Sequence, residues 1–203
     1  TRLLTVTGVQ TCALPIFITN PSAGKRARDG AIRAILFIAF LLASNVAWPF
    51  ADEEHDWGIP PTKELRQQPY SAPTPLAIPG ASIITTVQLQ ALLKSTPETI
   101  LIDVAAGDGH VTLRGAYWLP GAGRGNHFFD PLQAQLAEYL AQLSKGDKTR
   151  PLVFFCVSAQ CWLSYNASLR ASILGYSRVY WYRGGIEAWN EAGLPLAKVS
   201  LAP

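Results

Sequence analysis

The sequence predicts a single α/β domain of three layers, with helices on both faces of a mostly parallel central sheet. Two observations support this prediction. Short apolar runs rich in β-forming residues, TILIDV at 99–104 and PLVFF at 151–155, are typical of fully buried strands. Between such runs lie segments whose apolar side chains recur every three to four residues, as on one face of a helix. The predicted domain covers residues 81–203.

The first half of the domain is predicted to contain a short strand, a helix and a buried strand. Residues 82–85 form the short strand, and Thr86 caps a helix that continues to Lys94. The buried strand ends in Asp103, which we interpret as a structural acceptor for loop amides. A polar loop follows, and His110 and His127 are expected to be surface residues.

A glycine-rich loop, RGAYWLPGAGRG at 114–125, comes next. It offers backbone amides and carries two cations, Arg114 and Arg124. It matches no nucleotide-binding fingerprint, because GxxxxGK(S/T) is missing and no GxGxxG opens a helix. Asp130 and Pro131 then begin a helix as N-cap and first residue, and leucines continue along one face toward Gly146.

The chemically distinctive stretch is FFCVSAQCWLSYNASLR at 154–170. The buried strand leads into a tight loop that opens on Cys156, and a helix begins near Trp162, just after Cys161. Cys156 is therefore expected at the carboxyl edge of the sheet, where open α/β folds place ligands. Loop amides and the positive end of the helix dipole favour a thiolate there, which is the nucleophilic form of cysteine. The alternative is that Cys156 is a small core residue.

The chain ends with a further strand and a short helix. Residues 178–182 form the strand, Gly184 and Gly185 turn the chain, and the helix closes at GLP, 193–195. Aromatic side chains in and near these elements are interpreted as packing residues. They are Trp162, Trp181 and Trp189.

Three segments are expected to precede the domain. Residues 1–16 look like a translated sequencing-adapter oligonucleotide and are excluded from the fold. Residues 17–51 have the basic, apolar and small-residue order of a secretory signal, so we expect export to the periplasm. The apolar core is short for a membrane span, and none is expected after signal cleavage; an uncleaved anchor is the alternative. Residues 52–80 form a proline-rich arm, laid on the domain or reaching toward a partner, or a plain linker.

The charge balance gives no support for nucleic-acid binding. Five of the 17 Lys and Arg, but only one of the 14 Asp and Glu, lie before residue 52. The remainder therefore has 12 basic and 13 acidic residues and a net charge of −1. Without the segment that contains Cys12, the cysteines are Cys156 and Cys161, which an oxidising compartment would allow to pair. Two thiols and scattered histidines have no zinc-binding spacing, so no metal or cofactor is predicted.

Several motifs resemble the rhodanese family of single-domain sulfurtransferases over about residues 82–196. They are LIDV at 101–104, RGA at 114–116, the cysteine loop, and RGGIEAWNEAGLP at 183–195. The run CWLSYNASLR, the later GYSRVYWYRGG, and PYSAPTP and IPGA upstream more narrowly resemble the periplasmic CXXCW-motif proteins. That resemblance implies an association with pyrroloquinoline-quinone-dependent alcohol catabolism.

The resemblance implies a role for each residue of the cysteine loop. Cys156 would attack the outer sulfur of a donor such as thiosulfate and hold it as a persulfide. The amides of the loop would cradle this sulfur, and three further side chains would border the pocket. The loop residues are Val157, Ser158, Ala159, Gln160 and Trp162, and the bordering residues are Asp103, Arg114 and Arg124.

Three functions fit these observations. The first is a sulfurtransferase that uses a Cys156 persulfide and takes a small sulfur-containing anion. The second is a thiol–disulfide redox protein that acts on a protein thiol through Cys156 and Cys161, and Cys161 could then resolve the intermediate. It draws support from the loop VSAQC, which has no cation to bind a dianion, although a literal CXXC would need cysteine where Ser158 stands. The third is a non-catalytic binding module for a quinoprotein dehydrogenase or its cytochrome.

Overall fold

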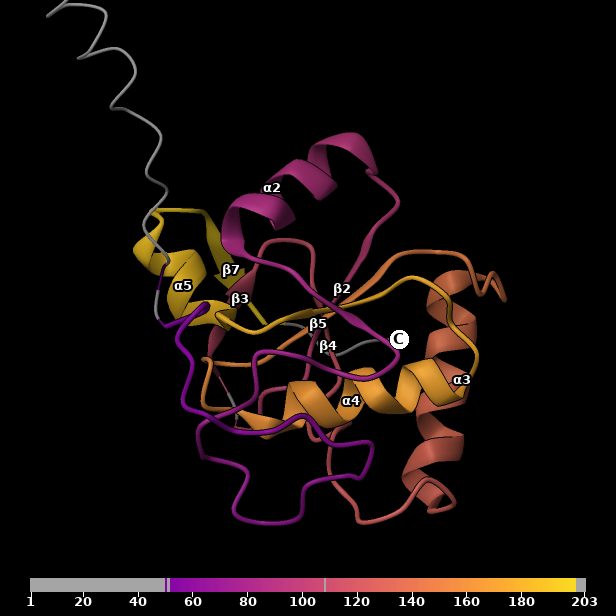
Figure 1. Ribbon diagram of the computed structural model, residues 1–203. Helices are drawn as coiled ribbons and strands as arrows, with labels where there is room; N and C mark the ends of the chain where they lie inside the picture. Colours follow the sequence, from indigo (N-terminus) through magenta and orange to yellow (C-terminus); the bar gives the residue numbers. More distant parts are fainter. Residues whose placement is uncertain (1–49, 51, 108, 200–203) are drawn as a thin grey trace, which may run out of the picture. The chain divides into compact units, whose positions relative to one another are not determined.

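The computed structural model describes residues 50, 52–107 and 109–199 (Figure 1). Its central sheet has five parallel strands in the order β1-β6-β5-β2-β4. The predicted α/β fold is therefore confirmed, whereas the segments expected at 1–16 and 17–51 lie outside the described residues, apart from Phe50. The strands are β1 (Ser82–Ile83), β2 (Ile100–Asp103), β4 (Tyr117–Trp118), β5 (Leu152–Phe155) and β6 (Val179–Tyr182).

Helices cover both faces of this sheet. Successive side chains of a strand point to opposite faces. Ile102 and Phe154 accordingly pack with residues of α3 and α4, whereas Leu101, Val153 and Phe155 pack with residues of α2 and α5. Burial on both sides explains why the strands are continuously apolar. The helices of the described chain are α2 (Thr86–Ser95), α3 (Pro131–Ser144), α4 (Trp162–Ile173) and α5 (Gly185–Glu191).

Local hydrogen bonds set the helix starts. Thr85, and not Thr86, is the N-cap of α2, because its side chain and that of Gln88 form a capping box. The predicted cap was therefore wrong by one residue. At α3 the predicted start is confirmed, since the Asp130 side chain accepts a hydrogen bond from the Gln133 amide and a proline occupies the first turn.

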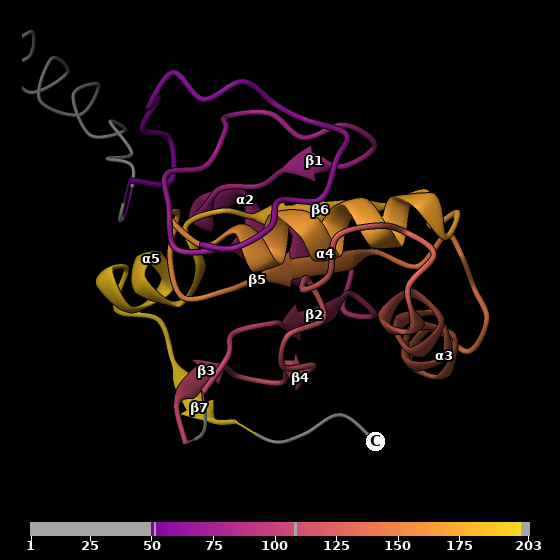
Figure 2. The same cartoon turned by 90° about the horizontal axis from the view of Figure 1, so that it is seen from below.

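The sequence did not predict a second, antiparallel sheet. In it, β3 (Val111–Leu113) pairs with β7 (Leu196–Lys198). Each strand has three residues and the two lie far apart in the sequence, so no local pattern marks the pairing. Figure 2 shows this small sheet to one side of the five-stranded sheet, below α5.

The proline-rich arm, residues 52–80, lies along α4 (Figure 1, Figure 2). Its apolar side chains pack against the outer side of this helix, so that α4 is covered both by the sheet and by the arm. This double cover explains why ten consecutive residues, 162–171, are buried. The cluster between arm and helix contains Leu65 and Ile78 with Trp162, Tyr165, Leu169 and Trp181.

Polar side chains of α4 bind the arm backbone. The Tyr165 hydroxyl donates to the carbonyl of Thr62 at 2.7 Å and accepts from its amide at 2.9 Å. Asn166 does the same for Arg66, at 2.8 and 3.0 Å. Because the arm has no regular secondary structure of its own, these side chains provide hydrogen bonds that a neighbouring β-strand would otherwise provide to its backbone.

Arg183, directly after β6, holds the beginning of the arm. Its side chain is 1% exposed, and its guanidinium donates five hydrogen bonds of 2.9 Å. Burial lowers the pKa of Arg183 to about 10, so the side chain stays charged at neutral pH. The Trp57 ring centroid lies 4.5 Å from the guanidinium carbon. The acceptors are both oxygens of Thr74 and the carbonyls of Asp52, Glu53 and His55.

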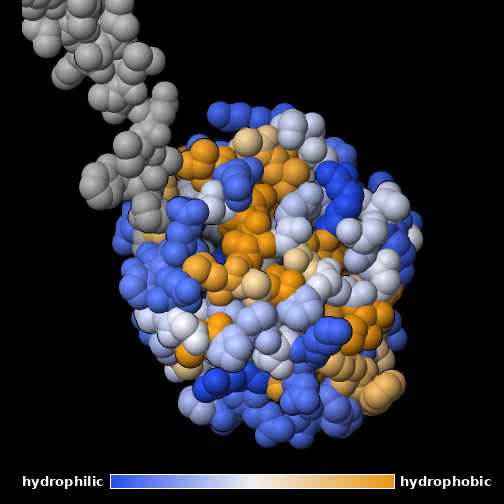
Figure 3. Space-filling model, in the orientation of Figure 1, coloured by the Kyte–Doolittle hydropathy of each residue, from blue (hydrophilic) through white to orange (hydrophobic). Residues whose placement is uncertain are grey.

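The face of the domain in Figure 3 mixes hydrophilic and hydrophobic residues, as is normal for a folded protein surface. Within the described ranges, the structure contains no helix of the length and apolarity that a membrane crossing requires.

Candidate functional site

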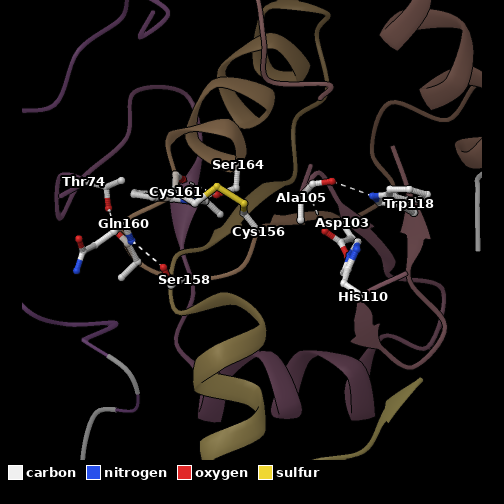
Figure 4. The surroundings of a disulfide bond; sticks show 12 residues. Thr74, Asp103, Ala105, His110, Trp118, Cys156, Ser158, Gln160, Cys161 and Ser164 are labelled. Carbon is white, nitrogen blue, oxygen red and sulfur yellow. Dashed lines mark hydrogen bonds and ion pairs between the residues drawn. A yellow bond between two sulfur atoms is a disulfide. The ribbon is translucent and has the colours of Figure 1, made fainter. Parts of the chain in front are cut away.

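The two cysteines form a disulfide at the carboxyl end of β5 (Figure 4). Cys156 directly follows the strand and is 2% exposed, while Cys161 is half-buried at the N-cap position of α4. Their Cα atoms are 6.1 Å apart. The predicted placement of Cys156 at this sheet edge is confirmed, and the pairing that the sequence left open exists in this structure.

The arm adds a short antiparallel pairing to the cysteine loop. Ser71 and Cys161 form a β-bridge, the Trp162 amide donates to the Tyr70 carbonyl at 2.9 Å, and the Ala72 amide donates to the Gln160 carbonyl at 3.0 Å. Two side-chain bonds continue the contact: the Thr74 hydroxyl donates to the Ala159 carbonyl at 2.6 Å, and the Trp162 indole donates to the Pro73 carbonyl at 3.0 Å. Residues 70–74 therefore hold one side of the loop.

Helix α5 holds the other side. The amides of Ile186 and Glu187 donate to the carbonyls of Cys156 and Val157 at 3.0 and 2.9 Å. Gly185 makes this approach possible, since its φ is +63° and a Cβ there would collide with the Cys156 carbonyl. This is a physical reason for the paired glycines that turn the chain.

Protein acceptors already occupy several loop amides in the disulfide form. The Gln160 amide donates to the Ser158 hydroxyl at 3.3 Å, and the Cys161 amide donates to the Ser158 carbonyl at 3.2 Å. With the Trp162 amide on Tyr70, the three consecutive amides of residues 160–162 are engaged. The amides of Val157, Ser158 and Ala159 take part in no hydrogen bond among the described residues.

A pocket of about 460 Å³ contains both cysteines in its wall. The arm, the glycine-rich loop and α5 each contribute residues to it. Of the two predicted cations, Arg124 lines this pocket, whereas Arg114 is exposed elsewhere. The lining residues are Gln68, Tyr70, Ser71, Ala106, Arg124, Cys156, Val157, Ser158, Gln160, Cys161, Leu163 and Glu187.

Asp103 does not line this pocket. It is fully buried, and its Oδ1 accepts a hydrogen bond from the Ala105 amide at 2.8 Å, which confirms the structural role predicted for it. Its Oδ2 lies 2.7 Å from Nε2 of His110, whose side chain is 22% exposed. His110 therefore lies in a loop and is partly exposed, as expected, but the sequence did not predict its contact with Asp103. The sequence signal was the pair Gly107 and Gly109, whose positive φ angles let the loop fold back onto the strand end.

The predicted packing aromatics are confirmed, with Trp181 fully buried and Trp162 and Trp189 nearly so. Trp162 lies next to Cys161 but packs against Tyr165, with ring centroids 4.9 Å apart. The described residues contain no group of three or more His, Cys, Asp or Glu side chains that could hold a metal ion.

Comparison with known proteins identifies the domain. No curated protein sequence is significantly similar to the chain. Solved structures that resemble it include a thiosulfate sulfurtransferase from Pseudomonas aeruginosa (22% identity, TM-score 0.44), of which the match covers 21%, and 60% of this chain. Others are a Rhodopseudomonas palustris protein described as a possible tyrosine phosphatase (20% identity, TM-score 0.42) and a rhodanese-like domain from Anabaena (19% identity, TM-score 0.42). Both matches cover 58% of this chain, and 85% and 78% of the others.

A family model gives the assignment. The model of the rhodanese-like domain matches residues 85–192, which is more than half of the chain and includes both cysteines. The chain therefore belongs to the rhodanese-like domain family.

Proposed function

We propose that this protein is an exported sulfurtransferase in which Cys156 accepts sulfur as a persulfide and Cys161 then resolves it. The observation that supports the proposal is the Cys156–Cys161 disulfide, set in a pocket at the carboxyl edge of a rhodanese-like sheet. A disulfide within the loop is the product expected when the Cys161 thiolate attacks Sγ of a Cys156 persulfide and hydrosulfide leaves.

The proposed reaction has two balanced steps. In the dithiol form, the Cys156 thiolate attacks the outer sulfur of a donor such as thiosulfate, the donor S–S bond breaks, and sulfite leaves with the electron pair. The Cys161 thiolate then attacks Sγ of Cys156, and hydrosulfide leaves as the disulfide forms. The transferred sulfur is reduced to sulfide and the two cysteines are oxidised by two electrons. A thiol reductant restores the dithiol.

The place of action and the wider role extend the same proposal. The basic-then-apolar pattern in residues 17–51 supports export to the periplasm, where an oxidised resting form is normal. The resemblance of CWLSYNASLR and its flanking motifs to CXXCW-motif proteins supports a role beside quinoprotein alcohol oxidation.

A thiol–disulfide redox protein without sulfur transfer is the second candidate. The engaged amides of Gln160, Cys161 and Trp162 favour it, because they already donate to Ser158 and to the Tyr70 carbonyl and are not available to a persulfide in this conformation. Both candidates use the same cysteine pair, and they differ in whether Cys156 ever carries an extra sulfur.

Intact mass measurement distinguishes the two candidates. The protein, with Cys12→Ser so that only the pair reports, is reduced, freed of reductant and mixed with thiosulfate. We expect sulfide release and disulfide formation, and in Cys161→Ser a stable gain of one sulfur atom that a reductant removes. Cys156→Ser should gain none. The redox function replaces the sulfurtransferase under two conditions. Cys161→Ser gains no sulfur from thiosulfate, and the reduced protein with both cysteines is still oxidised to the Cys156–Cys161 disulfide by protein disulfides or small disulfides.

A further inference from the structure

We infer that the pocket beside the disulfide binds a small zwitterionic thiol, that is, an amino-acid thiol bearing both an ammonium and a carboxylate group. The inference names the reductant class of the same site and rests on the proposed function in using the Cys156–Cys161 pair. Such a compound would enter with its sulfur toward the disulfide and its two charges toward Arg124 and Glu187.

Two residues of opposite charge line the pocket, and they come from different elements. Arg124 belongs to the loop after β4, where its amide closes a turn on the Gly121 carbonyl at 2.8 Å. Its side chain folds back over that glycine, since a Cβ at Gly121 would lie 3.1 Å from Arg124 Cδ and Nε. Glu187 belongs to α5 and is fixed beside the cysteine loop by the hydrogen bond that its backbone amide donates to the Val157 carbonyl.

Among the residues that the structure describes, neither Arg124 nor Glu187 forms an ion pair. The ion pairs found in the described part of the chain join Arg170 to Asp130 and His110 to Asp103. Arg124 and Glu187 are exposed and belong to neither pair. Both are therefore available to a ligand that enters the pocket.

The charge pattern discriminates among ligands. A dianion such as thiosulfate is attracted by Arg124 and repelled by Glu187, so the two effects oppose each other. A zwitterion can place its carboxylate near Arg124 and its ammonium near Glu187, so both effects favour binding. The volume of about 460 Å³ is within the range of small-molecule sites. Gln68 and Gln160 add amide groups, and Leu163 an apolar wall.

The reaction in this pocket is thiol–disulfide exchange. The ligand thiolate attacks Sγ of Cys161, the more exposed of the two cysteines, and the Cys156–Cys161 bond breaks. Cys156 leaves as a thiolate at the carboxyl edge of the sheet, and a mixed disulfide of the ligand with Cys161 forms. A second ligand thiol attacks this mixed disulfide, which yields the dithiol protein and the oxidised ligand.

The test is a charge series of small thiols that reduce the disulfide of the full-length protein. Its members are 2-mercaptoethanol (uncharged), cysteamine (cationic), 2-mercaptoethanesulfonate (anionic) and cysteine (zwitterionic), with rates expressed per thiolate. Each rate is divided by that of 2-mercaptoethanol on the same variant. We expect the highest ratio for cysteine, and changes of roughly two- to fivefold in the variants, the range that exposed ion pairs give.

The variants assign the effect to the two charges. Glu187→Gln should lower the ratios for cysteine and cysteamine and raise that for the sulfonate. Arg124→Gln should lower the ratios for cysteine and the sulfonate. Arg178→Gln, at an exposed cation outside the pocket, is the matched control and should change no ratio. The thermal midpoint of each variant reports folding.

Two results would overturn the inference: equal ratios for all four thiols, or ratios that change as much in Arg178→Gln as in the pocket variants. Because the measurement needs no sulfur donor, its failure is separate from that of the proposed function. A protein that never gains sulfur yet shows the charge pattern refutes the sulfurtransferase alone.

Discussion

Replacement of Arg183 should detach the start of the arm from the domain. The guanidinium is buried and donates five hydrogen bonds, to the carbonyls of Asp52, Glu53 and His55 and to both oxygens of Thr74. Arg183→Met keeps much of the length and volume of the side chain but removes every donor. The carbonyl oxygens of Glu53 and Thr74, whose bonds to the guanidinium are buried, then lose this partner.

The size of the effect follows from opposing contributions. Hydrogen bonds to a charged group contribute about 1.5–3 kcal/mol each, but relief from the desolvation of the guanidinium offsets part of their sum. Removal of one partner from a buried charged contact typically costs about 3–5 kcal/mol, which we expect here. For a chain of this length that loss lowers the thermal midpoint by roughly 6–20 °C.

Two measurements check this expectation. Calorimetry gives the thermal midpoint, and limited trypsin digestion reports the arm, since Lys63 is exposed within it. Arg183→Met should be cut in the arm faster than the wild type. The control is Arg178→Met, at an exposed arginine that should change stability by less than about 0.5 kcal/mol. If Arg183→Met lies within about 1 kcal/mol of the wild type and its arm stays resistant, the reasoning about the buried guanidinium is wrong.

Two further variants test the arm and the cysteine loop. Burial raises the pKa of Glu53 above its ordinary value of 4.5, although hydrogen bonds from Thr86 act in the opposite direction. Folding then favours the protonated acid, so urea titrations should show wild-type stability falling relative to Glu53→Gln as pH rises above 4.5; a difference constant with pH would contradict this. Gly185→Ala should cost about 1–3 kcal/mol more than Gly193→Ala, because both glycines have positive φ but only the first would collide with the cysteine loop. Equal losses of unfolding free energy would show that the close approach carries no cost.

Local patterns in the sequence predicted the cysteine loop and four of the five strands of the parallel sheet, but not β4, which lies within the predicted glycine-rich loop. Apolar runs marked β2, β5 and β6 to within one or two residues, because buried parallel strands have few polar positions. The Asp130 cap was predictable because its partner, the Gln133 amide, is only three residues away. The helix start at Trp162 followed from the change in spacing of the apolar residues there.

Contacts between distant segments could not be predicted. Arginine is normally a surface residue, and nothing near Arg183 indicates that Asp52, Glu53 and His55 lie against it. The apolar residues of the arm follow neither a helix nor a strand period, because the hydrogen bonds of the arm backbone are made with side chains of α4 and with the cysteine loop. Arg114 and Arg124 looked equivalent in the sequence because both lie in the glycine-rich loop. Only the loop conformation shows that Arg124 lines the pocket and Arg114 does not.

One hydroxyl group joins the anchor of the arm to the cysteine loop. Thr74 is 1% exposed, and its Oγ1 accepts from Nε of Arg183 at 2.9 Å. A hydroxyl has a single proton, and here it is donated to the Ala159 carbonyl at 2.6 Å. Arg183 thus fixes the direction in which Thr74 donates, and Thr74 fixes the loop between the two cysteines. The carbonyl of Gln160, the next residue, accepts from the arm as well, through the Ala72 amide. A rearrangement of Ala159 and Gln160 on opening the disulfide must therefore break arm contacts or move the arm, which makes the arm a structural part of the cysteine site.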